Sequence, residues 1–118
     1  MINLDAIKDF RVLLVGDAIM DEYIYVKTIG KAVKENALSA IKHRTEQFQG
    51  GVWAAANHLQ GMVAQIATMP GDKMMLNSRL VDETYIRKLF VTHELVDNPN
   101  PHFDFYIPSF DLVIITDF

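Results

Sequence analysis

The sequence predicts an α/β fold in which a parallel sheet is interrupted by a small antiparallel β excursion. Continuous apolar runs at residues 12–16 and 112–115 lie directly before an aspartate or a Thr-Asp pair. Such runs are typical of strands that are buried on both faces, as in parallel sheets. Between them, the pair Gly50-Gly51 is followed at once by an alanine-rich stretch with helical periodicity.

The composition is that of a globular protein with room for one domain, or of part of a larger one. The chain has 118 residues, of which 50% are hydrophobic, and a net charge of −4. Without clustered Lys and Arg, nucleic-acid binding is not expected. The absence of cysteine excludes disulfides and thiolate metal sites and suits a reducing compartment. No signal peptide and no apolar run of about 20 residues is found, so we expect a cytoplasmic protein without membrane contact.

The amino-terminal segment predicts a short amphipathic helix over residues 4–9 and a buried strand over residues 11–17. Asp17 and Asp21 follow this strand. Open α/β sheets bind ligands at the carboxyl ends of their strands, which makes both aspartates candidate site residues. The alternative, a solvated turn, stays open for each of them.

The β excursion is predicted from alternation of side chains. In residues 22–27, Tyr23 and Tyr25 lie on the face opposite Ile24 and Val26. Residues 38–48 and 84–94 alternate in the same way, and a loop is expected around Gly30. These three segments could form a polar antiparallel sheet that acts as a cover.

The stretch after the excursion predicts a helix that begins at the glycine pair. One helical face carries apolar side chains at the required spacing, namely Val52, Ala55, Ala56, Leu59 and Val63. Glycines allow close approach of a ligand, and the first amides of a helix are unpaired donors suited to polar or anionic oxygens. A strand–turn–helix joint without a ligand remains the alternative.

The carboxyl-terminal half predicts two further strands of the main sheet. The first covers residues 63–68 and ends at a turn in residues 69–72, where Pro and Gly are adjacent. A loop is expected at residues 97–101, and the last strand lies within residues 109–118. Helical crossovers between these strands are not evident, although parallel strands usually need them.

Four stretches occur in the order found in PfkB (ribokinase-like) carbohydrate kinases, and they resemble the amino-terminal half of that family. They are VLLVGDAIMDEY, FQGGVWAAANHL, YIRKLF and DLVIITDF. The similarity is greatest to heptose-phosphate kinases and related sugar kinases. The resemblance implies one incomplete domain over residues 1–118: a partial ribokinase-like (Rossmann-like) parallel sheet with a small antiparallel β lid, whose strands lie near residues 22–27, 38–48 and 84–94.

The resemblance also implies a site for the acceptor sugar. Asp21 would accept hydrogen bonds from sugar hydroxyls, Asp17 would line the same pocket, and the amides of Gly50 and Gly51 would approach from the other side. The family places Asn three positions after the second glycine, where this chain has Ala54. Asn57, one turn further along, is the expected substitute, and we expect its neighbour His58 to be buried and structural.

A second family motif, Gly-Ala-Gly-Asp, does not occur in the sequence. The resemblance assigns to it the catalytic Asp and the site of the transferring phosphate, so we assign no catalytic residue here. ATP and Mg would belong to the complete family enzyme, and neither is expected to bind well to this chain alone. A naturally shortened relative and a chain with segments missing both remain open.

Two functions follow as expectations. The first is a sugar kinase chain that holds the acceptor half-site and lid, with ATP-dependent phosphoryl transfer to a sugar or sugar phosphate in the complete protein. The second is a non-catalytic sugar-binding or dimerisation module that forms a homodimer through its lid strands. A metal site is disfavoured because His43, His58, His93 and His102 are scattered, and a Ser hydrolase because no nucleophile-elbow motif is present.

Overall fold

The computed structural model describes residues 2–99 and 107–117. They divide into two compact units. The first unit comprises residues 1–19, 49–75 and 95–118, and the second comprises residues 20–48 and 76–94. The chain passes between the units within four strands rather than through linkers.

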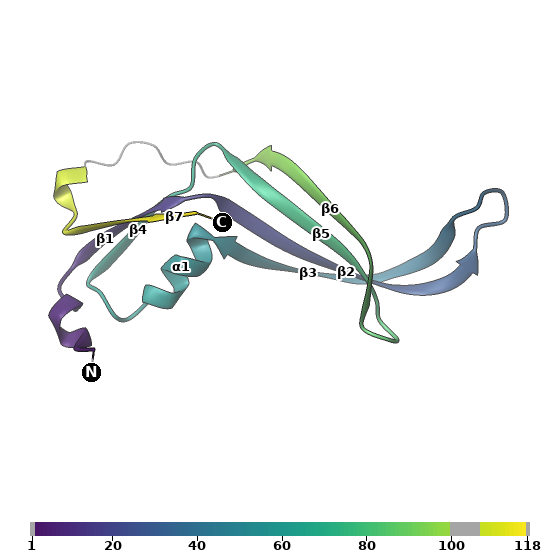
Figure 1. The fold of residues 1–118 in the computed structure, drawn as a ribbon, viewed down its shortest axis with the longest axis horizontal. Helices are drawn as coiled ribbons and strands as arrows, with labels where there is room; N and C mark the ends of the chain where they lie inside the picture. Colours follow the sequence, from purple (N-terminus) through teal and green to yellow (C-terminus); the bar gives the residue numbers. More distant parts are fainter. Residues whose placement is uncertain (1, 100–106, 118) are drawn as a thin grey trace. The chain divides into compact units, whose positions relative to one another are not determined.

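The first unit is built on a three-stranded parallel sheet in the order β4-β1-β7 (Figure 1). Its elements are the 3₁₀ helix η1 (Leu4–Ile7), β1 (Arg11–Gly16), α1 (Val52–Leu59), β4 (Gln65–Met69), the 3₁₀ helix η2 (Ile107–Ser109) and β7 (Leu112–Thr116). In the register, Leu13 of β1 lies opposite Ala67 on one side and Val113 on the other. The α/β class and the parallel sheet predicted from the apolar runs are therefore confirmed.

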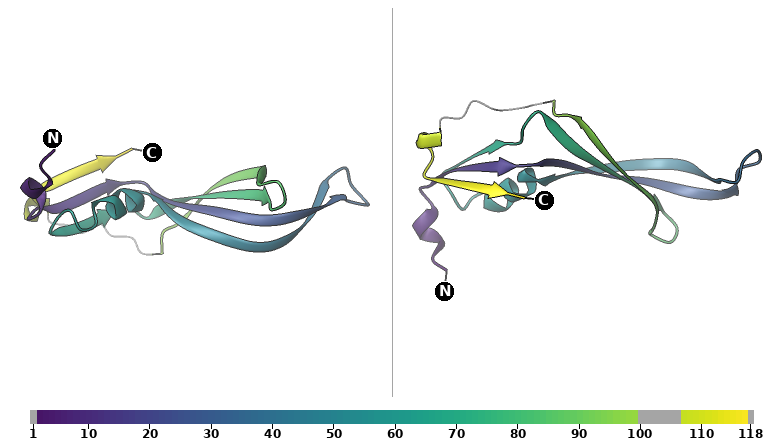
Figure 2. Two further views of the ribbon diagram at one scale, coloured as in Figure 1. Left: turned by 90° about the horizontal axis from the view of Figure 1, so that it is seen from below. Right: turned by 45° about the horizontal axis from the view of Figure 1, so that its top comes forward.

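Strand β1 forms the centre of the core. Val12 and Leu13 are 0% exposed and Leu14 is 1% exposed. Helix α1 covers one face of the sheet, with Val52 packed against Val12 and Leu14 (Figure 2). The apolar face predicted for the helix is the face that is packed, but the helix ends at Leu59, so Val63 contributes from the connection to β4 rather than from the helix.

Strand β7 shares the sequence pattern of β1 but not its burial. It lies at the sheet edge, and Leu112, Val113 and Ile115 are 40%, 37% and 79% exposed. The strand was predicted correctly, while burial on both faces was not. The apolar pattern of a strand does not show whether neighbouring elements cover it, and in β7 Ile114 is the residue that packs against the core cluster of Val12, Leu14 and Val52.

The second unit contains most of a four-stranded mixed sheet in the order β3-β2-β5-β6. Its strands are β2 (Ala18–Lys31), β3 (Leu38–Gly51), β5 (Lys73–Asp82) and β6 (Arg87–Asp97). The hairpins β2–β3 and β5–β6 are joined along β2 and β5, where the amide of Glu83 donates to the carbonyl oxygen of Val26 at 2.9 Å. The hydroxyl of Ser78 donates to the carboxylate of Glu22 at 3.0 Å. Glu22 comes before Val26 and Ser78 comes before Glu83, so β2 and β5 run in the same direction.

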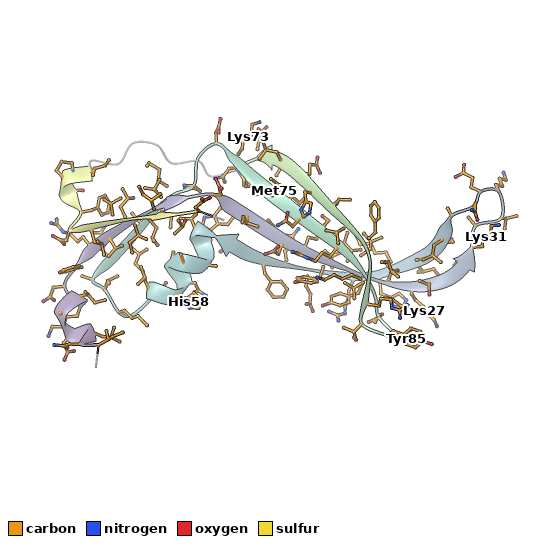
Figure 3. The ribbon with its side chains drawn as sticks, in the orientation of Figure 1. Lys27, Lys31, His58, Lys73, Met75 and Tyr85 are labelled. Atoms are coloured by element: carbon orange, nitrogen blue, oxygen red, sulfur yellow. The ribbon has the colours of Figure 1, made fainter. Side chains whose placement is uncertain are left out.

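Four details of this sheet differ from the sequence predictions. Gly30 lies inside β2 with a φ of +109°, and the turn follows it at residues 32–37. Strand β5 occupies a segment for which no strand was predicted. Strand β6 begins at Arg87, so Tyr85 lies in the preceding turn and is 77% exposed (Figure 3). The predicted loop at residues 97–101 begins inside β6, and residues 100 and 101 lie outside the described residues.

One face of the sheet carries the contacts expected from alternation. Tyr23 and Phe48 meet edge to face, with ring centroids 5.8 Å apart. On the same face, the guanidinium of Arg44 lies 3.8 Å from the ring centroid of Tyr25, whose hydroxyl donates to Glu46 at 3.3 Å. The predicted faces of residues 22–27 and 38–48 are therefore confirmed.

The start of β1 is fixed to the segment before β7 by Arg11 and Asp111. The backbone amide of Arg11 donates to Oδ2 of Asp111 at 2.8 Å, and the amide of Asp111 donates to the carbonyl oxygen of Arg11 at 2.8 Å. The Arg11 guanidinium donates to the same carboxylate at 3.3 Å. The side-chain and backbone hydrogen bonds from Arg11 lower the pKa of Asp111 below its usual value.

This pairing predicts a specific response to acid. A carboxyl whose pKa is lowered in the folded state stabilises the fold above its unfolded pKa of about 4, and that contribution is lost as the pH falls through the lower folded value. In Asp111→Asn, the free energy of unfolding should therefore fall less steeply as the pH drops below about 4. Urea unfolding between pH 2.5 and 7 measures this. The control Asp9→Asn removes an exposed carboxylate that lies two residues before Arg11 in the sequence. If the free energy of unfolding changed equally with pH in the wild type, Asp111→Asn and Asp9→Asn, the stabilising role of Asp111 would be contradicted.

Candidate functional site

The end of β1 and the start of α1 are joined through Asp17 and Gly51. The amide of Val52 donates to the carbonyl oxygen of Asp17 at 2.9 Å. Gly51 has φ +61° and ψ −132°, which disfavours residues with a Cβ. A Cβ added at Gly51 would lie 2.2 Å from the carbonyl oxygen of Asp17, so the backbone of Gly51 occupies space that only glycine fits. We call this contact the strand–helix joint.

The joint places a carboxylate next to the first turn of a helix. Asp17 is exposed, directly beyond the carboxyl end of β1, and Gly50 is half-buried at the end of β3. The first amides of a helix have no acceptor within the helix. In α1, the amide of Val52 is bound by the carbonyl oxygen of Asp17, which lies outside the helix. Both hydrogen-bond acceptors and donors are thus available at this edge, as a hydroxylated ligand requires.

Asp21 belongs to the second unit and is bound by strand β5. Its Oδ1 accepts from Nη1 of Arg79 at 2.8 Å and from Nδ2 of Asn77 at 3.4 Å. The hydrogen bond to Asp21 is the main reason why the pKa of the Arg79 guanidinium is raised. Oδ1 of Asp21 is therefore already hydrogen-bonded within the protein, and Oδ2 is the oxygen that can accept a hydrogen bond from a ligand.

Asn57 lies in the last turn of α1 and is exposed. The helix residues that pack in the core are Val52, Trp53, Ala55, Ala56 and Leu59, and Asn57 is not one of them. His58 is exposed as well and projects from α1 (Figure 3), so the prediction that it is buried was wrong. The error has a simple cause: five of the eight helix residues pack in the core, and His58 lies on the side that they leave open.

Of the residues predicted for the site, the structure joins Asp17, Gly50 and Gly51 in the first unit, and it holds Asp21 in the second. A shared cleft that includes Asp21 and Asn57 stays a prediction. Arg79 and Asn77 were missed because strand β5 was not predicted. The sequence of this strand does not alternate cleanly, because Met75 and Val81 are apolar and Ser78 lies between Leu76 and Leu80, so no clear signal for it was present.

Two hollows of the described residues lie apart from the predicted site residues. Open hollows of about 340 and 330 Å³ are lined by residues 2–5 and by residues 30, 31 and 36–38, and neither includes a predicted site residue. Within residues 2–99 and 107–117, no group of three or more His, Cys, Asp or Glu side chains could hold a metal ion. His102 lies outside this part of the chain. No helix among the described residues is long and apolar enough to span a membrane.

No protein-family model and no curated protein sequence matches the chain. Solved structures do match. A putative ribokinase from Agrobacterium tumefaciens is 16% identical with a TM-score of 0.44, and the match covers 91% of this chain and 44% of that one. A carbohydrate kinase from the same organism is 13% identical with a TM-score of 0.42, covering 72% and 35%.

A ribokinase from Cryptococcus neoformans var. grubii serotype A, in complex with ADP, is 10% identical with a TM-score of 0.41, covering 91% of this chain and 40% of that one. The chain is thus structurally similar, at low identity, to part of ribokinase and carbohydrate kinase chains. It spans less than half the length of each of them.

The strand–helix joint predicts that Gly51→Ala is strongly destabilising. Backbone strain at positive φ costs about 1–2 kcal/mol, and the overlap with the Asp17 carbonyl adds about 1–3 kcal/mol. We expect the free energy of unfolding to fall by about 3 kcal/mol in urea titrations.

Gly61→Ala is the matched control, because Gly61 also has a positive φ, of +82°, but a Cβ there would meet nothing within 4 Å. It should cost only about 1 kcal/mol, the strain alone. Equal losses for the two variants would mean that the close approach at Asp17 does not exist.

Proposed function

We propose that this chain carries the acceptor-sugar half-site and the lid of a ribokinase-like (PfkB) sugar kinase. The complete protein would transfer a phosphoryl group from ATP to a sugar or sugar phosphate. The observation that carries the proposal is the strand–helix joint, in which Asp17 at the end of a buried parallel strand meets a glycine that opens a helix. The motif order along the sequence, given above, supports the same assignment.

In this proposal the residues of the chain bind and orient the sugar. Asp21 accepts a hydrogen bond from a sugar hydroxyl, Asp17 accepts another, and the amides of Gly50 and Gly51 donate to sugar oxygens. Asn57 supplies an amide in place of the family's asparagine. ATP and Mg would supply the phosphoryl group and its charge stabilisation when bound to the complete protein. No residue of this chain is assigned as catalytic.

The four-stranded sheet would act as the lid. Closing a lid excludes water, so that phosphoryl transfer goes to the sugar rather than to solvent. Such a sheet would also be the surface of a homodimer. The lack of cysteine is compatible with the cytoplasm, which we propose as the location.

A second function, a non-catalytic sugar-binding or dimerisation module, is favoured by one observation. Large apolar side chains are exposed on both faces of the four-stranded sheet: Ile41 is 52% exposed, Phe90 is 60% exposed, and Phe48, on the face of Tyr23, is 52% exposed. Large apolar side chains that are exposed on a sheet can contribute to an interaction surface. In this case the chain would form a dimer, with or without bound sugar, and would not need to bind a nucleotide.

Isothermal titration calorimetry tests the leading function. We expect heat from at least one of D-ribose, D-fructose, D-fructose 6-phosphate and sedoheptulose 7-phosphate, and binding about 10-fold or more weaker in Asp21→Asn. A hydrogen bond to a charged group is worth about 1.5–3 kcal/mol, which sets that ratio.

Asp5→Asn, at an exposed carboxylate in η1, is the control and should bind like the wild type. Binding of no sugar by the wild type would refute the leading function. Such a protein that also sediments as a stable dimer would instead be the assembly module.

A further inference from the structure

A chain of hydrogen bonds crosses three strands of the four-stranded sheet and ends at Asp21. Nδ1 of His93 on β6 lies 2.6 Å from Oδ1 of Asn77 on β5. Nδ2 of Asn77 lies 3.4 Å from Oδ1 of Asp21 on β2. Nη1 of Arg79, two residues after Asn77 on β5, lies 2.8 Å from the same oxygen. All of these side chains belong to the second unit.

Donor and acceptor chemistry fixes the direction of this chain. Oδ1 of Asn77 can only accept, so Nδ1 of His93 must carry a proton. Nδ2 of Asn77 can only donate, and the ionised carboxylate of Asp21 can only accept. The opposite orientation of the Asn77 amide would set its oxygen against the carboxylate and is disfavoured.

Arg79 is itself held in place. Its guanidinium carbon lies 5.3 Å from the centroid of the Tyr23 ring, within the range of a cation–π contact. Its side chain is 20% exposed and that of Asp21 is 29% exposed, so the ion pair is partly shielded but open to a ligand. Oδ1 of Asp21 is therefore bound twice, while Oδ2 accepts no hydrogen bond from a described residue.

We propose that Arg79, together with Asn77 and His93, is a positioning group that fixes the rotation of the Asp21 carboxylate and leaves Oδ2 as its ligand-facing oxygen. This inference rests on the proposed function. A fixed, ionised Oδ2 selects ligands that offer a hydroxyl donor at that point, and it disfavours sugars in which this hydroxyl is missing or methylated. The three residues act through Asp21, without contact with the sugar.

The first test needs no ligand. Long-range ¹H–¹⁵N correlation spectra should show the Nδ1–H form of the His93 ring near pH 8, and Asn77→Ala should abolish that preference. A ring that is protonated at Nε2 with a bare Nδ1 in the wild type would overturn the hydrogen-bond chain, whatever the protein binds.

The second test measures affinity for D-fructose 6-phosphate by calorimetry, with sedoheptulose 7-phosphate as a second probe. Arg79→Lys keeps the charge but loses the planar donor group and should bind about 10-fold more weakly. His93→Ala should bind about threefold more weakly, and His93→Gln, which keeps a donor, should restore most of the loss. Thr92→Ala, at an exposed neighbour on the opposite face of β6, should bind like the wild type.

The outcomes separate the two proposals. If Asp21→Asn loses binding while Arg79→Lys binds as the wild type does, the positioning role is wrong and the proposed function stands. If Asp21→Asn binds normally, or the wild type binds neither probe nor any other sugar of the panel, the proposed function fails and the positioning role fails with it. Unchanged circular dichroism and urea midpoints show that each variant is folded.

Discussion

The close contact between Gly51 and the carbonyl oxygen of Asp17 is the constraint on which the rest of the first unit depends. The amide of Val52 binds this oxygen at 2.9 Å, and Val52 is also the helix residue that packs on Val12 and Leu14. One short segment thus determines both where α1 begins and which face it buries. A Cβ at Gly51 would separate strand and helix, because it would lie 2.2 Å from the Asp17 oxygen.

Sequence patterns predicted the elements whose burial follows from their own residues. The run at residues 12–16 indicated a buried strand, and the apolar positions of residues 52–59 indicated the packed face of α1. Strand β7 was predicted from the same kind of run, but its exposure was not, since burial of Ile115 depends on what lies beside it. Strand β5 was missed because Met75, Ser78 and Val81 break the alternation of apolar and polar residues along it. Its residues Asn77 and Arg79 form contacts that only the folded sheet creates.

For the candidate site, the sequence supplied residue types and the structure supplied their partners. Asp17 and Asp21 were singled out from the same strand exit, yet their surroundings differ. Asp17 is exposed beside a helix start, whereas Asp21 is bound by Arg79 and Asn77. The partners of Asp21 come from a strand more than fifty residues further along the chain, so local spacing could not predict them. A carboxylate held in this way has a defined orientation, which a lone aspartate in a turn does not.

The most direct measurement of the strand–helix joint is the scalar coupling across its hydrogen bond, between the amide nitrogen of Val52 and the carbonyl carbon of Asp17. We predict a detectable coupling and slow exchange of the Val52 amide with solvent, because this bond closes the joint at the edge of the core. No coupling, together with exchange as fast as that of an unstructured peptide, would contradict the account.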